Sequence, residues 1–417
     1  MTYIEFYDNT CIENICTCLT NPPDRVILVG DKKKTLEIHA ERYRQVMEDR
    51  DCDVEFVPLT VNKNSMQDII AKLSEIVETY DECVFDLTGG EDALLVATGI
   101  VYERYKDRNI QMHRINIRNG TVLDMDMDGE TVAQSEMPEL TVAENIRIYG
   151  GDIVYDDEKE GATYLWDFSS DLERDVNAMW EVCRVDVRLW NTQIGVFGAA
   201  ELLKDGGEYD LNTFVSIQKL KNYLERNGAK YVFIGRIINA LQKSGLIEAY
   251  DDGTNLSVTY KNEQVRRCLT KAGQALEMKM FVSAAKARDK DGAYTYNDVM
   301  NGVYIDWDGD IHTEQEGHDT ENEIDVMMMH GMVPVFVSCK NGYVDMDELY
   351  KLNAVAVRFG GMYAKKVLIP AATEENSEFG QYLSQRAYAM NIRIVWNITD
   401  KNDEELQKTM RTLWNNN

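Results

Sequence analysis

The sequence predicts an α/β protein with an N-terminal, doubly wound parallel sheet, a helical and winged-helix-like middle, and a C-terminal α/β unit that carries a metal site. Three observations predict this organisation. Short apolar runs alternate with helix-period stretches over residues 1–125, two helices precede a hairpin at 216–260, and an aspartate and a lysine lie on neighbouring strands at 323–340. The 417 residues have room for two or three domains, each with its own core.

The predicted elements of residues 1–125 alternate in type. The predicted strands are 3–7, 25–29, 54–57, 83–87 and 113–117, and the predicted helices are 35–49, 66–80 and 92–105. Ser65 can cap the helix at 66–80, because its hydroxyl can accept a backbone N–H of the first turn. Strands that alternate with helices predict a parallel sheet, which binds ligands at the carboxyl ends of its strands.

Two polar loops follow strands at that edge of the sheet. In the loop at 86–92 (DLTGGED), a strand ends, two glycines turn and a helix begins, so that a ligand can approach the backbone closely. Glu91 and Asp92 satisfy the helix dipole, which argues against a free phosphate and favours a ligand held through bases and hydroxyls. The residues expected to line this ligand crevice are Asn9, Thr10, Thr88, Gly89 and Gly90.

An acidic, glycine-flanked stretch at 150–161 predicts the end of the first unit. Beyond it, helices are predicted within 165–204 and at 216–226 and 234–244, and strands at 245–250 and 256–260. Two helices followed by a hairpin with an Asp-Asp-Gly turn predict a winged-helix-like unit, which either binds nucleic acid or connects domains. Arg236 and Lys243 are the only basic residues of the presumed recognition helix, which favours the connector.

The last unit mixes helices and strands. The predicted helices are 274–286, 346–357, 379–390 and 404–414, the predicted strands are 302–307, 323–328, 333–339, 366–369 and 393–396, and a polar acidic loop spans 308–322. We expect three units in all, at residues 1–150, 151–276 and 277–417.

One pair of these strands predicts a catalytic metal site. Asp325 lies on a strand, and twelve residues separate it from Ser338, which shares a strand face with Lys340 because side chains alternate with period two. Carboxylates at this strand end would hold Mg²⁺ or Mn²⁺, and the lysine would orient a water or stabilise an anionic phosphorane. Glu277, on the preceding helix, is a further expected ligand.

The composition restricts the functions that are possible. Lys and Arg number 44 and Asp and Glu number 72, which gives a formal net charge of −28. Such a chain repels phosphate on average, so any nucleic-acid site must be local and needs cations. No run of about 18 uncharged apolar residues occurs, and the N-terminus is not a signal peptide, so we expect a cytoplasmic protein without a membrane span.

Residues 86–99 (DLTGGEDALLVATG) resemble the CRISPR-associated Rossmann-fold (CARF) sensor domain, and residues 322–342 (NEIDVMMMHGMVPVFVSCKNG) resemble the PD-(D/E)XK nuclease domain that is joined to such sensors. The resemblance implies a homodimer that binds cyclic tetra-adenylate across its two-fold axis and then cuts DNA, RNA or both with a metal ion. It implies that the crevice residues bind this ligand. Many members carry glutamate where this chain has Ser338, a weak metal ligand, so Glu277 or Glu323 is expected to substitute.

The alternative belongs to another class. A sensor joined to a winged helix also suits a nucleotide-sensing transcription regulator with an inactive nuclease fold, and Ser338 in place of glutamate is the best support for it. A gel shift on duplex DNA in EDTA, compared with a cleavage assay in Mn²⁺, distinguishes the two functions.

Overall fold

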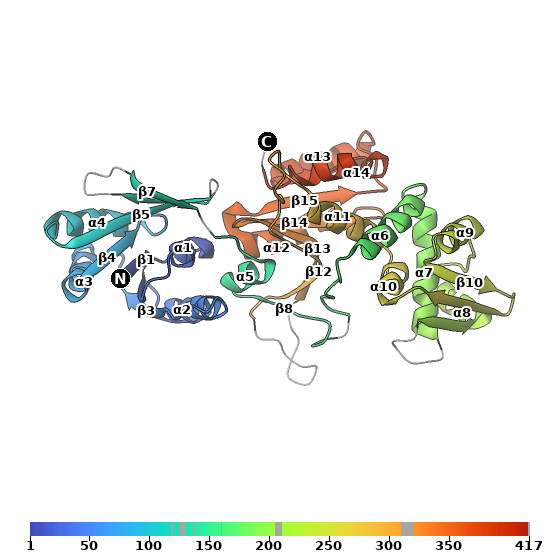
Figure 1. Cartoon of the computed structure of the whole chain (residues 1–417), viewed down its shortest axis with the longest axis horizontal. Coiled ribbons are helices and arrows are strands. Elements are labelled where there is room, and N and C mark those ends of the chain that lie inside the picture. Colours follow the sequence, from blue (N-terminus) through green and yellow to red (C-terminus); the bar gives the residue numbers. More distant parts are fainter. Residues whose placement is uncertain are drawn as a thin grey trace.

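The computed structural model describes residues 1–117, 120–125, 131–136, 138–159, 161–204, 211–309 and 321–415, with the backbone alone at 131–135. The described residues form three sheets along an elongated molecule (Figure 1). A seven-stranded sheet lies at one end, a three-stranded sheet at the other end, and a six-stranded sheet between them. Within these residues, no helix has the length and the apolar character that crossing a lipid bilayer would need.

The N-terminal sheet has the order β3-β2-β1-β4-β5-β6-β7, parallel from β3 to β5 and antiparallel beyond. Its strands are β1 (Thr2–Phe6), β2 (Arg25–Gly30), β3 (Glu55–Thr60), β4 (Glu82–Asp86), β5 (Asn109–Asn116), β6 (Thr121–Met125) and β7 (Thr131–Glu136). Its helices are η1 (Cys11–Asn14), α1 (Cys16–Thr20), α2 (Lys33–Glu48), α3 (Met66–Thr79) and α4 (Asp92–Arg104). The five parallel strands and three long helices agree with the sequence prediction, whereas β6, β7, η1 and α1 were not predicted.

Side chains that alternate along β1 build the two faces of this sheet. Ile4 and Phe6 pack into the core beneath α3 and α4, whereas Tyr3 packs into the core that α2 covers. The hydroxyl of Ser65 accepts the backbone N–H of Asp68 at 3.2 Å, so the predicted cap of α3 is present.

The middle of the chain forms the three-stranded sheet, with the order β10-β11-β9. Its elements are α6 (Ser170–Cys183), α7 (Val187–Leu203), β9 (Asn212–Ser216), α8 (Ile217–Arg226), α9 (Gly235–Lys243), β10 (Ile247–Asp251), β11 (Asn255–Tyr260) and α10 (Glu263–Thr270). The predicted order of two helices and a hairpin is present, and β9 adds an antiparallel strand beside β11.

The central sheet has the order β16-β15-β14-β13-β12-β8. It contains β8 (Asp152–Ile153), β12 (Asp298–Asp306), β13 (Glu321–His330), β14 (Val333–Lys340), β15 (Lys365–Pro370) and β16 (Ile392–Ile394), with the helices α5 (Val142–Ile148), α11 (Gln274–Ala285), α12 (Asp347–Gly360), η2 (Gly361–Tyr363), α13 (Glu378–Ala389), η3 (Ile398–Asp400) and α14 (Asp403–Met410). Strand β12 begins before the predicted residue 302, and β8 lies inside the stretch predicted as a boundary. Most of the predicted acidic loop at 308–322 lies outside the described residues.

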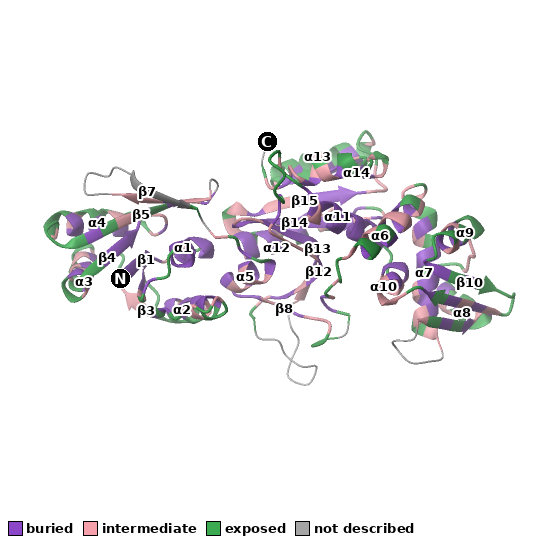
Figure 2. Cartoon of the chain, in the orientation of Figure 1, coloured by how far each residue is buried: buried purple, intermediate pink, exposed green. Residues whose placement is uncertain are grey.

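Helix α11 and strand β14 form the interior of this part of the molecule (Figure 2). Every residue of α11 except Ala285 is buried, and so is every residue of β14 except Lys340. The elements that carry the predicted catalytic residues are therefore rigidly packed, which fixes the side chains at the end of β14.

Candidate functional site

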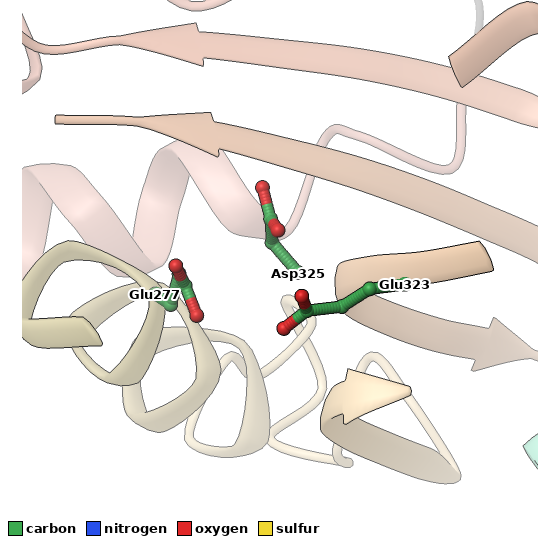
Figure 3. Close-up of side chains that lie close together, drawn as sticks. All are labelled: Glu277, Glu323 and Asp325. Carbon is green, nitrogen blue, oxygen red and sulfur yellow. The ribbon is translucent and has the colours of Figure 1, made fainter. Parts of the chain in front are cut away.

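Three carboxyl groups from two elements converge beside the central sheet. Glu277 lies in the first turn of α11, and Glu323 and Asp325 leave the same face of β13 because they are two residues apart. One oxygen of each lies within 4.8 Å of the other two, and Figure 3 shows the three groups pointing toward one another. We call this cluster the carboxylate triad. Hard oxygen donors of this kind suit Mg²⁺ or Mn²⁺.

Strand β14 holds Asp325 in place. The Oδ2 of Asp325 accepts the backbone N–H of Cys339 at 2.6 Å and lies 3.3 Å from the hydroxyl of Ser338. The ammonium group of Lys340 lies 3.7 Å from the same oxygen. Burial raises the pKa of the Asp325 carboxyl, and the positive charge of Lys340 opposes that rise. The two neighbouring strands thus bring together Asp325, Ser338 and Lys340.

Glu277 is the most enclosed member of the triad. It is 5% exposed, and its Oε2 has no hydrogen-bond partner among the described residues. Burial, and then the negative charge of Asp325, raises the pKa of Glu277 to about 8. A buried polar atom without a partner costs free energy, and a divalent cation would supply the missing partner. The triad therefore fits a metal ion on its own geometry.

Lys340 also contacts the helix that follows its strand. Its ammonium group lies 3.0 Å from the carboxylate of Glu348, in the first turn of α12. Burial alone would lower the pKa of Lys340, but the charges of Asp325 and Glu348 more than offset burial and raise it, so the lysine keeps its charge. A cavity of about 270 Å³ opens before Asp325, Ser338, Lys340 and Glu348.

Glu323 has two partners that the sequence analysis missed. Lys271 forms an ion pair with its carboxylate, and the hydroxyl of Tyr304 donates a hydrogen bond to its Oε2 at 3.0 Å. Glu348 was missed as well. It could have been found from the sequence, because it is an acidic residue in the first turn of the helix that follows the strand of Lys340. Lys271 carries no such pattern, because it lies in the segment before α11. Tyr304 reaches Glu323 because the two residues face each other in the antiparallel pair of β12 and β13.

A cavity of about 390 Å³ lies at the carboxyl ends of β1, β2 and β4. Asn9 and Gly90 line it, as do Lys32 and Lys63, which the sequence analysis did not single out. The ammonium group of Lys63 lies 2.9 Å from Glu91, so the acidic start of α4 is partly neutralised. Lys32 could have been predicted to line the cavity, because it comes soon after Gly30, the last residue of β2, at the carboxyl edge of the sheet.

The other predicted crevice residues, Thr10, Thr88 and Gly89, are not among those that line the cavity. The hydroxyl of Thr88 accepts the backbone N–H of Ile115 at 2.8 Å, and its own N–H donates to Asp86 at 2.7 Å. Thr88 therefore ties the glycine turn to β5. Gly90 adopts a φ of +95°, and a Cβ there would lie 2.5 Å from the Cβ of Phe6, so glycine is required.

Two carboxyl groups are buried together behind this turn. Glu5 and Asp86 both lie within hydrogen-bond distance of the hydroxyl of Thr17, which is 3.0 Å from Asp86 Oδ2. Burial raises the pKa of Asp86 to about 6, and burial together with the charge of Asp86 raises the pKa of Glu5. A single hydroxyl cannot donate to both, so the pair is most stable when it holds a proton.

No protein-family model and no curated protein matches the sequence. The crystal structure of protein VC1899 from Vibrio cholerae aligns with 99% of this chain and 97% of its own, with a TM-score of 0.70 and 16% identity. The structure of Can2 from Sulfobacillus thermosulfidooxidans in complex with cyclic tetra-adenylate aligns with 100% of this chain and 99% of its own, with a TM-score of 0.67 and 15% identity. This chain therefore has the mixed α/β fold of these two proteins from end to end.

Proposed function

We propose that this chain is an endonuclease of type III CRISPR defence that is activated by cyclic tetra-adenylate, requires a divalent metal ion and cleaves DNA or RNA. The observation that carries the proposal is the juxtaposition of the carboxylate triad with Lys340 at the end of two neighbouring strands. The likeness to Can2, whose structure holds cyclic tetra-adenylate, supports the activator.

In this proposal, residues 1–150 are a CARF sensor, 151–276 a connector and 277–417 a PD-(D/E)XK nuclease. Two copies would form a homodimer, because a two-fold axis matches the symmetry of one closed tetranucleotide ring. Asn9 and Gly90 line the cavity that would receive the ring, and Lys32 and Lys63 would face its phosphates.

The triad would hold Mg²⁺ or Mn²⁺. When bound, the ion would offset the negative charge that develops on the scissile phosphate. Lys340, charged and 3.7 Å from Asp325, would donate a hydrogen bond to a phosphate oxygen or to the attacking water. Cys339 would keep Asp325 oriented through its backbone N–H, and Ser338 would support that orientation more weakly because its hydroxyl lies farther from the carboxylate.

The test is cleavage of supercoiled DNA and single-stranded RNA in Mn²⁺, with and without cyclic tetra-adenylate. We expect ligand-dependent cutting that Lys340→Ala reduces by about a hundredfold or more. Lys106→Ala is the control, because Lys106 also forms an ion pair, 2.9 Å from Glu103, but follows α4 in the N-terminal part of the chain. If Lys340→Ala cuts as well as the unmodified chain, the proposed catalytic centre is wrong.

The alternative, a transcription regulator, has less support. Arg236 is one of the two basic residues of α9, and its guanidinium lies 2.9 Å from the carboxylate of Asp186. The helix that would contact DNA therefore carries little free positive charge.

A further inference from the structure

A further cavity lies beside the carboxylate triad. It encloses about 500 Å³ and is bordered by the segment before α6, by α10 and by β12. Glu323 of the carboxylate triad forms part of its wall, so the cavity is adjacent to the proposed cutting centre. Its volume lies within the range of roughly 300–1,000 Å³ that small-molecule sites occupy.

Aromatic rings and a guanidinium dominate one side of this cavity. The guanidinium of Arg267 lies over the ring of Tyr164, 4.0 Å from its centroid, and the rings of Tyr164 and Trp166 meet edge to face with centroids 5.0 Å apart. Both rings are only partly buried. Partly open aromatic planes that are held rigidly offer a base a surface to stack on, and every base can use such a surface.

The positive charges of the cavity are already paired. Arg266 contacts Glu201 at 2.6 Å and Glu263 at 2.7 Å, and Arg267 contacts Asp156 at 2.7 Å. A phosphate would have to compete with these carboxylates for the guanidinium groups, whereas a base would not. The cavity is therefore suited to the base of a nucleotide rather than to its phosphate.

A pair of buried amides connects the cavity to the triad. The side chain of Gln274, which lines the cavity, donates to Asn301 at 2.8 Å, and Asn301 donates in turn to the backbone carbonyl of Asp325 at 2.8 Å. A base in the cavity would thus lie against residues that hold the metal-bearing strand. The sugar and phosphate of that nucleotide would lie on the side of the cavity that Glu323 borders, next to the carboxylate triad.

We propose that this cavity binds one unstacked base of a single-stranded nucleic acid, on Tyr164 and Trp166, while the adjoining phosphate lies at the carboxylate triad. This inference rests on the proposed function and names the form of its substrate. A duplex would not fit, because its bases are already stacked and paired and could enter the cavity only after extrusion. Because the arginines are paired within the protein, we expect stacking on the aromatic rings to contribute much of the affinity.

The test measures binding without cleavage. The full-length Asp325→Asn chain is titrated in Mn²⁺, with and without cyclic tetra-adenylate, against a short fluorescein-labelled single strand and against the same sequence as a duplex. We expect the single strand to bind more tightly than the duplex. We expect Tyr164→Ala and Trp166→Ala, added to this background, each to weaken binding of the single strand about tenfold, and Tyr164→Phe to bind within about twofold of the parent.

Tyr294→Ala is the matched control, because the guanidinium of Arg288 lies over Tyr294 at 3.9 Å but neither residue borders the cavity. It should bind as the parent does. Thermal melting of Tyr164→Phe and Tyr164→Ala separates lost stacking from lost folding. Equal affinity of Tyr164→Ala and the parent, no binding of the single strand, or tighter binding of the duplex would overturn the inference. Absence of cleavage by the unmodified chain in Mn²⁺ would overturn only the proposed function, since the binding assay does not depend on catalysis.

Discussion

The hydroxyl of Tyr363 donates a hydrogen bond to the carboxylate of Glu13 at 2.6 Å and so joins η2, at the end of α12, to η1, which follows β1. The other oxygen of Glu13 lies beside the glycine turn, 3.9 Å from where a Cβ on Gly89 would be. At the opposite end of α12, Glu348 contacts Lys340. Helix α12 and the η2 turn that continues it therefore link η1, beside the glycine turn, to the proposed catalytic lysine.

This contact predicts that Tyr363→Phe uncouples the ligand from cleavage. The substitution removes a hydrogen bond to a largely buried carboxyl group, and bonds of that kind are worth about 1.5–3 kcal/mol. We expect the ratio of cleavage with and without cyclic tetra-adenylate to fall about tenfold, while metal-ion affinity stays unchanged. Tyr388→Phe, on α13, changes a tyrosine that is 88% exposed and should leave the ratio unaffected. An unaltered ratio for Tyr363→Phe would mean that α12 does not carry the coupling.

Glu277→Gln should change stability and metal binding in opposite directions. Without metal, the substitution removes a buried carboxyl group beside Asp325, so the melting temperature in EDTA should rise by a few degrees. With Mn²⁺, it removes a ligand, so affinity measured by calorimetry should fall about tenfold or more.

Ser338→Ala provides the comparison for that result. The hydroxyl of Ser338 is 3.3 Å from Asp325 and is not part of the triad, so Mn²⁺ affinity should stay within about twofold. If Ser338→Ala weakens Mn²⁺ binding as much as Glu277→Gln does, the serine is a ligand and the triad is wrongly composed.

Gly90→Ala should destabilise the N-terminal sheet. The added methyl group would meet the Cβ of Phe6 at 2.5 Å in a backbone conformation that disfavours side chains, which predicts a loss of about 2 kcal/mol or more. Gly99→Ala, within α4, meets no atom within 4 Å and should raise stability by about 0.5–1 kcal/mol. Urea unfolding of both variants measures the difference, and equal effects would contradict this account of the turn.

The buried pair of Glu5 and Asp86 predicts a pH dependence. The folded pKa of each is raised, to about 6 for Asp86, so the folded state binds protons more tightly than the unfolded chain does. The pair's contribution to stability is complete below the ordinary carboxyl pKa of about 4 and is lost as the pH rises through about 6 and beyond. The melting temperature should therefore fall from pH 5 to pH 8. Glu5→Gln should raise it at pH 8 and flatten this part of the curve, and an unchanged slope would contradict the assignment.

Much of the N-terminal sheet could be predicted because each element carries its own local pattern. Strand β2 is a continuous apolar run, and α3 has both an apolar stripe and a serine cap. Strands β8 and β9 could not be predicted in this way. Strand β8 has only two residues, and its partner β12 begins at Asp298, so nothing near it in the sequence indicates a pairing.

The same distinction applies to the proposed sites. The meeting of Asp325 and Lys340 could be predicted because they lie on consecutive strands of one hairpin. The cavity next to them could not, because Tyr164 and Arg267 reach it from segments about a hundred residues apart, and no periodicity links such segments.

The pairing of β8 with β12 also sets an order of assembly. A ribosome releases Asp152 and Ile153 long before the strand they pair with, and the whole three-stranded unit emerges in between. The three-stranded sheet can form while β8 is still unpaired, whereas the central sheet can be completed only near the end of synthesis. A chain interrupted before β14 contains no Lys340 and therefore lacks the proposed catalytic centre.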